Sequence, residues 1–100
     1  MNKIFLTTAI VGLFLSSCTR TNDFKPTAEM TGKDIFNAAC VECHAAEGDS
    51  VMVLNAEMND VDRIANHVLT GSISMPAFPN IQGESAKILA EYVVENSTFK

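Results

Sequence analysis

The chain has 100 residues and a mass of 10.8 kDa, which leaves room for one domain. Hydrophobic residues make up 47% of it and charged residues 19%, so most of the chain can fold. Twelve acidic residues against seven basic ones give a formal charge of −5. This balance argues against a nucleic-acid-binding protein, which needs a basic face. Three cysteines are an odd number, so a framework made only of disulfides would leave one unpaired.

The N-terminus has the pattern of an export signal. Lys3 precedes a mostly apolar stretch, residues 4–15. This stretch is shorter than the roughly 20 residues of a membrane-spanning helix and fits the apolar core of a signal peptide. The sequence Leu15-Ser16-Ser17-Cys18 then resembles the lipobox of bacterial lipoproteins. The resemblance implies cleavage after residue 17 and a lipid on Cys18, which would anchor the exported protein to a bacterial membrane on the periplasmic or cell-surface side. The alternative is an ordinary cleaved signal, with Cys18 an incidental thiol.

Removal of residues 1–17 takes away one basic residue and leaves 83 residues with a charge of about −6. A chain of this size usually needs a stabilising element in addition to its own hydrophobic core, such as a metal or a large cofactor. Residues 18–30 are polar after Cys18, contain Pro26 and show no hydrophobic period, so we expect a flexible tether. Fully extended, residues 19–30 would reach roughly 40 Å, which would let residues 31–100 swing away from the membrane.

The first predicted helix begins near Thr31. Thr31 and Asp34 have the spacing of a capping box, in which each side chain accepts a hydrogen bond from the other residue's backbone N–H. Apolar residues and cysteines then recur at helical intervals. They are Ile35, Phe36, Ala39, Cys40 and Cys43.

Two further helices are predicted, from about residue 60 to 70 and from about residue 83 to 96. Asp60 can cap the first of them, and Gly71 stands where that helix would stop. The buried face of the second is marked by Ile88, Leu89, Tyr92 and Val93. No alternation of apolar and polar residues is long enough to predict a strand, so residues 31–100 are predicted to form one all-α domain.

The segment Cys40-Val41-Glu42-Cys43-His44 is a C-x-x-C-H motif, the signature of c-type haem attachment. Cysteines at positions i and i+3 share one helix face, so both sulfurs can bond one porphyrin edge while the adjacent histidine reaches the iron. The alternatives are a disulfide between the two cysteines, a thioredoxin-like redox pair and half a zinc site. A zinc site lacks a second ligand pair at the usual spacing, and a thioredoxin-like pair needs a βαβ context.

With this motif, the chain resembles the class I (monohaem) cytochromes c from about residue 32 to 94. Gly32-Lys33-Asp34-Ile35-Phe36 looks like the family's first helix, and Leu89 and Tyr92 match its packing partners on the last helix. The resemblance implies a small cytochrome c fold, with about three main helices around one haem c. It also implies covalent attachment through Cys40 and Cys43, with His44 as an axial ligand of the iron.

The second axial ligand is Met75 by the same resemblance, because residues 71–79 look like the family's distal loop. Pro76 disfavours a helical conformation at Met75, which frees its side chain to leave the helix register. Met52 lies only eight residues after His44, and Met58 precedes the second helix, so both suit the role less. His67 is the other candidate, but its place at the edge of the apolar stripe favours a surface histidine.

Two features of the family are missing. Residues 47–54 contain no proline to orient the proximal imidazole, and the chain has no tryptophan to bind the haem propionates. Arg63 is a candidate propionate partner on its charge alone.

Iron with six ligands has no open position for a substrate, so we expect an electron carrier that cycles between Fe(III) and Fe(II) and is not itself an enzyme. One alternative is a haem-based gas-binding or sensor module. Another is an electron-carrying subunit of a larger membrane oxidoreductase. The expected partners are the membrane and redox proteins whose docking faces are basic or neutral, because this chain is acidic.

Overall fold

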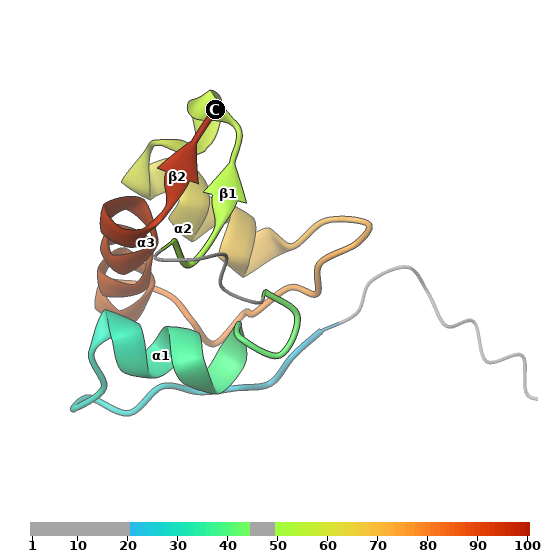
Figure 1. Ribbon diagram of the computed structural model, residues 1–100. Helices are drawn as coiled ribbons and strands as arrows, with labels where there is room; N and C mark the ends of the chain where they lie inside the picture. The colour runs from blue at the N-terminus through green and yellow to red at the C-terminus, as the bar shows by residue number, and fades with distance from the viewer. Residues whose placement is uncertain (1–20, 45–49) are drawn as a thin grey trace, which may run out of the picture.

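The computed structural model describes residues 21–44 and 50–100, and Figure 1 shows their arrangement. The predicted signal peptide and Cys18 lie outside the described residues. The elements follow in the order α1 (Gly32–Ala39), β1 (Val53–Leu54), a short 3₁₀ helix η1 (Ala56–Met58), α2 (Val61–Thr70), α3 (Glu84–Asn96) and β2 (Thr98–Phe99). The domain is therefore small and mostly helical, and the three predicted helices are confirmed.

Helix α1 begins with the predicted capping box. The Thr31 hydroxyl accepts a hydrogen bond from the Asp34 N–H at 3.1 Å, and the Asp34 carboxylate accepts one from the Thr31 N–H at 3.0 Å. The helix ends at Ala39, so the prediction that it continues to Cys43 is wrong. Cys40 has a φ of −114°, and the N–H groups of Cys40 and Val41 both point to the carbonyl oxygen of Phe36. The bond from Val41 spans five residues instead of four, so the regular ladder ends there. A tighter turn follows, in which the Cys43 N–H donates to the carbonyl oxygen of Cys40.

Helix α2 has both of the expected end signals. The Asp60 carboxylate accepts a hydrogen bond from the Arg63 N–H at 3.1 Å, which satisfies one of the free donors of the first turn. At the other end Gly71 has a φ of +69°, a conformation that side chains with a Cβ rarely adopt. The chain leaves the helix there, toward Met75.

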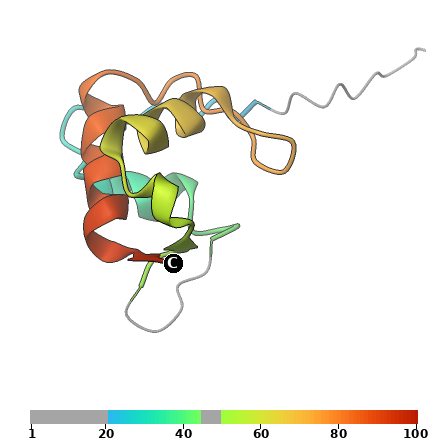
Figure 2. The same cartoon turned by 90° about the horizontal axis from the view of Figure 1, so that it is seen from above.

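Helix α3 packs against both α1 and α2, as Figures 1 and 2 show from two directions. The crossing with α1 is the one that the sequence predicts. Gly32 is buried against α3, and the rings of Phe36 and Tyr92 meet with their centroids 5.6 Å apart and their planes tilted by 53°. Tilted aromatic pairs of this kind stabilise a helix crossing beyond the area that they bury.

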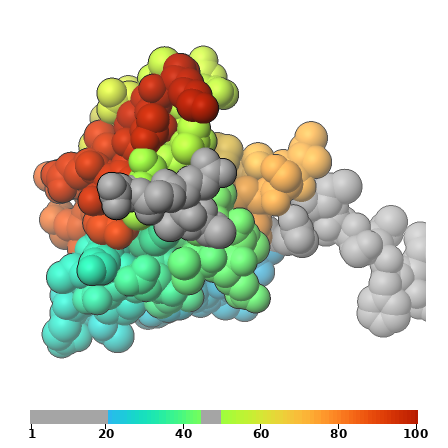
Figure 3. Space-filling view, viewed as in Figure 1, coloured from blue at the N-terminus to red at the C-terminus, as the bar shows by residue number. Residues whose placement is uncertain are grey.

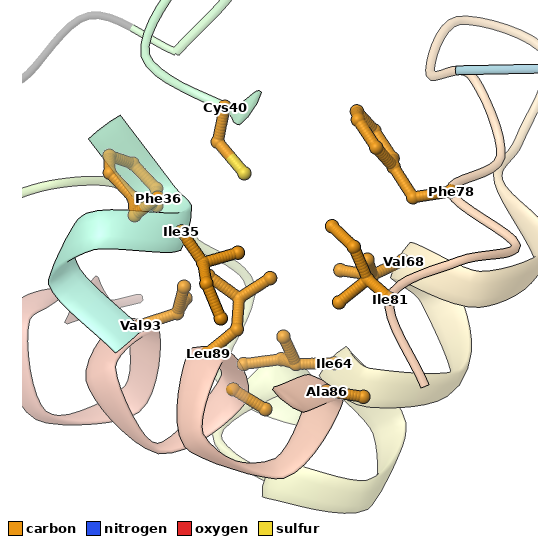
Figure 4. Close-up of a cluster of buried hydrophobic side chains, with 11 residues drawn as sticks. Ile35, Phe36, Cys40, Ile64, Val68, Phe78, Ile81, Ala86, Leu89 and Val93 are labelled. Carbon is orange, nitrogen blue, oxygen red and sulfur yellow. The ribbon is translucent and has the colours of Figure 1, made fainter. Parts of the chain in front are cut away.

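The core fills the space between the three helices and the segment that joins α2 to α3 (Figure 4). Its buried members are Ile35, Phe36, Cys40, Ile64, Val68, Phe78, Ile81, Ala86, Leu89, Ala90 and Val93. Figure 4 shows Cys40 at the edge of this cluster, with its sulfur directed toward the space between the helices. Part of the predicted motif is therefore built into the hydrophobic core.

A two-stranded parallel pair closes one end of the domain, although the sequence predicts no strand. Val53 pairs with Thr98 and Leu54 with Phe99. The pairing continues on both sides, because the Val51 N–H donates to Asn96 at 2.8 Å and the Ala56 N–H donates to Lys100 at 2.9 Å. Strands of two residues carry no detectable alternation, so only the meeting of segments far apart in the chain reveals them.

The segment expected to be a tether differs from that expectation. Residues 21–30 run along the domain beside α1, at the lower edge of Figure 3. The Asn22 N–H donates to the carbonyl oxygen of Ala77 at 2.8 Å, and the Asn80 side-chain amide donates to the carbonyl oxygen of Asp23 at 3.0 Å. Phe24 and Met30 are half-buried against the core. These contacts hold the segment on the domain, so residues 21–30 do not act as a free arm.

Among the residues that the structure describes, none of the helices combines the length and the hydrophobicity needed to cross a lipid bilayer.

Candidate functional site

A cavity of about 340 Å³ opens between the turn after α1, the β1 region, α2, the Met75 loop and α3. Its size is in the range of roughly 300–1,000 Å³ found for small-molecule sites. Most of its lining is apolar, with Asn55, Glu57 and two histidines as polar exceptions. Its lining includes the thiol, imidazole, thioether and apolar side chains of Cys40, His44, Met52, Met58, His67, Met75 and Leu89.

The C-x-x-C-H motif folds into one tight turn. The carbonyl oxygen of Cys40 accepts hydrogen bonds from the N–H groups of Cys43, at 3.2 Å, and His44, at 2.9 Å. The three residues of the motif that carry chemistry are thereby gathered at the end of α1. Cys40 is buried, His44 is half-buried and Cys43 is exposed. The two cysteines therefore lie at different depths below the protein surface.

The two cysteines of the motif are free thiols, with no disulfide between them. Burial raises the pKa of the Cys40 thiol to about 11, and the neighbouring Cys43 adds a smaller contribution in the same direction. A redox-active pair needs a cysteine whose pKa is lowered, because the thiolate is the reactive form. The environment of Cys40 therefore disfavours the thioredoxin-like alternative.

The zinc alternative finds no support within residues 21–44 and 50–100. No group of three or more His, Cys, Asp or Glu side chains there is placed to hold a metal ion.

Met75 lies on a loop that is held at both ends. The Ser72 N–H donates to the carbonyl oxygen of Met75 at 2.9 Å, and the Phe78 N–H donates to the carbonyl oxygen of Val68, in α2, at 2.8 Å. Gly71 has no space for a side chain, because a Cβ there would lie 2.6 Å from the Ala77 nitrogen. The loop thus folds back closely on the end of α2, and this brings the half-buried Met75 to the cavity.

Three side chains that the sequence analysis ranked below Met75 also reach the large cavity. They are Met52, Met58 and His67. His67 is half-buried at the edge of the apolar stripe of α2, and it also lines the cavity. The sequence predicts only where His67 lies around its own helix, which is at the edge of the apolar stripe. The cavity opens at that edge, and the sequence does not indicate this. Met52 comes to the cavity through the β1 pairing, for which the sequence has no signal.

A second, smaller cavity, of about 60 Å³, distinguishes Met75 from the other three candidate ligands, because Met75 lines it and they do not. It is bordered by Asn22, Cys40, Cys43, His44 and Met75, among others, while Met52, Met58 and His67 are not part of its wall. Met75 is therefore the methionine that shares a boundary with both cysteines of the motif. Arg63, the candidate propionate partner, is exposed on α2 and lines neither cavity.

Comparison with known proteins identifies the family of this chain. Residues 27–93 match the family described as cytochrome c oxidase, cbb3-type, subunit III. Cytochrome c6 from Cyanidium caldarium is 31% identical over 75 residues, which cover 66% of this chain and 69% of that protein. Cytochromes c6 from Porphyra purpurea and Pyropia tenera are each 34% identical over 76 residues, with 66% of this chain covered and 69% and 89% of theirs. The chain belongs to the monohaem c-type cytochromes. No solved structure matches it.

As a c-type cytochrome, the protein carries one covalently bound haem c and transfers electrons between redox partners without being an enzyme. Cytochromes of this kind typically work outside the cytoplasm. The residues present fit this cofactor. The cavity is apolar where a macrocycle needs to be shielded from water, and its wall offers thiol, imidazole and thioether groups, which are the donors that c-type haem uses.

Proposed function

We propose that the haem of this cytochrome is attached through the sulfurs of Cys40 and Cys43, with His44 and Met75 as the axial ligands of its iron. One observation carries the proposal. Cys40, His44 and Met75 line the large cavity, and Cys43 joins all three on the boundary of the small one. These side chains come from two segments of the chain, and the folded domain brings them to one place.

When bound, the haem supplies one-electron chemistry between Fe(III) and Fe(II). Thioether bonds to Cys40 and Cys43 would hold it without reliance on packing alone. With His44 and Met75 at both axial positions, no position is left for a substrate, which suits a carrier. The Met75 thioether favours the reduced iron and so raises the reduction potential, while buried apolar side chains such as Leu89 keep water away.

Visible spectra of the wild type and of Met75→Ala, each oxidised and reduced, test the ligation. We expect a low-spin wild type and a high-spin Met75→Ala variant. Met58→Ala, a change to another methionine of the cavity wall, serves as the control and should stay low-spin. An unchanged spectrum in Met75→Ala would show that Met75 is not a ligand of the iron. Rapid and tight binding of carbon monoxide to the reduced wild type would favour a gas-binding module instead.

We further propose that Cys18 carries the lipid and anchors the cytochrome to a membrane outside the cytoplasm. The support is the apolar segment 4–15 followed by the lipobox-like sequence at residues 15–18. Because the chain is held on the domain from Asn22 onward, only three peptide steps separate Cys18 from Thr21, about 10 Å when fully extended. The anchor would then keep the Ala77 edge of the domain close to the membrane surface.

A second candidate function is supported by the match to subunit III of a cbb3-type oxidase. In that case the protein would pass electrons to a fixed neighbour in a membrane complex. Purification of the full-length protein in mild detergent distinguishes the two. A stable complex that survives gel filtration supports the subunit, and isolation as a single chain supports the independent carrier.

A further inference from the structure

The N-terminal segment of the domain holds the loop that carries Met75. We call residues 21–24 the strap. The Asn22 N–H donates to the carbonyl oxygen of Ala77 at 2.8 Å, and Thr21 and Ala77 form a parallel bridge. The Asn80 side-chain amide donates to the carbonyl oxygen of Asp23 at 3.0 Å. Two hydrogen bonds, one running each way, therefore join the strap to residues 77–80, more than fifty positions later in the chain.

These bonds act next to Met75 itself. Pro76, which stands between Met75 and Ala77, has no N–H. The backbone at residue 76 therefore cannot donate a hydrogen bond that would hold the loop there. The turn formed by Ser72 and Met75 holds the loop on one side of that position. On the other side, the bond from Asn22 holds the carbonyl of Ala77, two residues after Met75. The Met75 side chain thus projects from a short stretch of backbone that is fixed at both ends.

The strap is itself anchored, so it can resist movement of the loop. The Asn22 side-chain oxygen accepts a hydrogen bond from the Phe24 N–H at 2.9 Å, and Phe24 is half-buried against the core. Asn22 also borders the small cavity that Cys43 and Met75 share. The strap therefore reaches the edge of the cofactor site.

We propose that the strap is a positioning element for the axial methionine. By holding Ala77 in place, Asn22 and Asn80 keep the Met75 loop closed, so that the thioether stays on the iron in competition with external ligands. This inference rests on the proposed ligation by Met75. Asn22 and Asn80 act through the loop backbone and not on the haem directly.

The test uses the haem-loaded full-length cytochrome and titrates the oxidised protein with imidazole, which binds the iron only where the methionine leaves it. Asn22→Pro removes the N–H that donates to Ala77 and also the side-chain oxygen that accepts from the Phe24 N–H. Asn80→Ala removes only the amide that donates to Asp23. Loss of one such hydrogen bond should strengthen imidazole binding by about three- to tenfold. Because Asn22→Pro can disturb folding, Asn80→Ala gives a milder variant with the same expectation.

Two matched controls separate loop opening from a general loss of stability. Ala28→Pro places a proline in the same N-terminal segment, at the second position of the turn closed by the bond from Met30 to Thr27, where proline is favoured. Asn96→Ala removes a similar amide bond, from Asn96 to the carbonyl oxygen of Tyr92 at 2.8 Å, far from the loop. Both controls should bind imidazole within about twofold of the wild type, as expected for surface changes away from the site.

Equal imidazole affinity in the wild type and both strap variants would overturn the proposal and leave the ligation by Met75 standing. An equal rise in the Asn96→Ala control would also overturn it, because the effect would then reflect stability alone. If the spectrum of Met75→Ala matches that of the wild type, the proposed ligation and the strap inference fail together.

Discussion

Gly32 in α1 lies directly against the backbone carbonyl of Ile88 in α3. A Cβ at this position would collide with that carbonyl oxygen and would also lie 2.8 Å from the Cβ of Tyr92. The backbone of α3 cannot yield as the tip of a side chain can. The crossing of the two helices therefore depends on the absence of a side chain at residue 32, and it supports the turn from which Cys40 points to the cavity.

Gly32→Ala is accordingly expected to lower the free energy of unfolding of the haem-loaded protein by about 3 kcal/mol, the upper end of the usual cost of overpacking. Denaturant titration measures the loss. Asn37→Ala, at an exposed position of the same helix, is the control and should stay within about 0.5 kcal/mol of the wild type. Equal midpoints for the two variants would show that the helices do not cross as closely as described.

The capping box of α1 predicts a dependence of stability on acid. The backbone N–H of Thr31 is the main cause that lowers the pKa of Asp34 below its ordinary value of 3.8. Because the pKa is lower in the folded state, Asp34 stabilises the fold above pH 3.8, and this contribution is lost as the pH falls through the folded-state pKa. Asp34→Asn should thus be less stable than the wild type at neutral pH, with the gap closing in acid.

Unfolding measured between pH 7 and pH 3 checks this expectation. Ala38→Gly is the control, because it weakens the same helix by about 1 kcal/mol without changing a titrating group. Its gap to the wild type should stay constant with pH. A gap for Asp34→Asn that also stays constant would show that the carboxylate does not cap the helix in solution.

His67 provides a test of the choice between the two candidate axial ligands. It lines the large cavity but not the small one that Met75 shares with both cysteines. We therefore expect His67→Ala to keep a low-spin spectrum in both oxidation states. A high-spin His67→Ala variant, together with an unchanged spectrum of Met75→Ala, would show that the axial ligands are two histidines, His44 and His67.

The lipid anchor predicts a change of cell fraction. Cys18→Ser should move the cytochrome from the membrane fraction to the soluble extracytoplasmic fraction and remove the mass of the lipid from the mature protein. Thr19→Ser, at the next residue, is the matched control and should remain with the membrane. A Cys18→Ser protein that stays in the membrane fraction without detergent would contradict the anchor.

The acidic composition predicts how the cytochrome meets its partners. With a formal charge of −5 for the whole chain and about −6 without residues 1–17, it should react fastest with a redox protein whose docking face is basic. Because salt screens exposed charges over about 8–10 Å, raising the ionic strength from 0.01 to 0.5 M should slow electron transfer to such a partner in stopped-flow measurements. A rate that rises with salt would refute attraction between opposite charges.

Much of this molecule could be predicted from short stretches of sequence, because the interactions concerned are local. The Thr31–Asp34 capping box, the cap at Asp60 and the helix stop at Gly71 each depend on residues within one turn, and all three are confirmed. The C-x-x-C-H spacing likewise indicates a c-type cytochrome from five consecutive residues. The roles of Cys40, Cys43, His44 and Met75 stay predictions until the ligand experiments are done.

Other features depend on contacts between distant parts of the chain and could not be predicted in this way. The pairing of β1 with β2 and the hydrogen bond from Asn22 to Ala77 leave no periodic trace in the sequence. The position of His67 at the cavity likewise depends on how α2 packs against the Met75 loop and η1. Local propensity decides where helices begin and end, whereas the packing of remote segments decides which side chains face the haem.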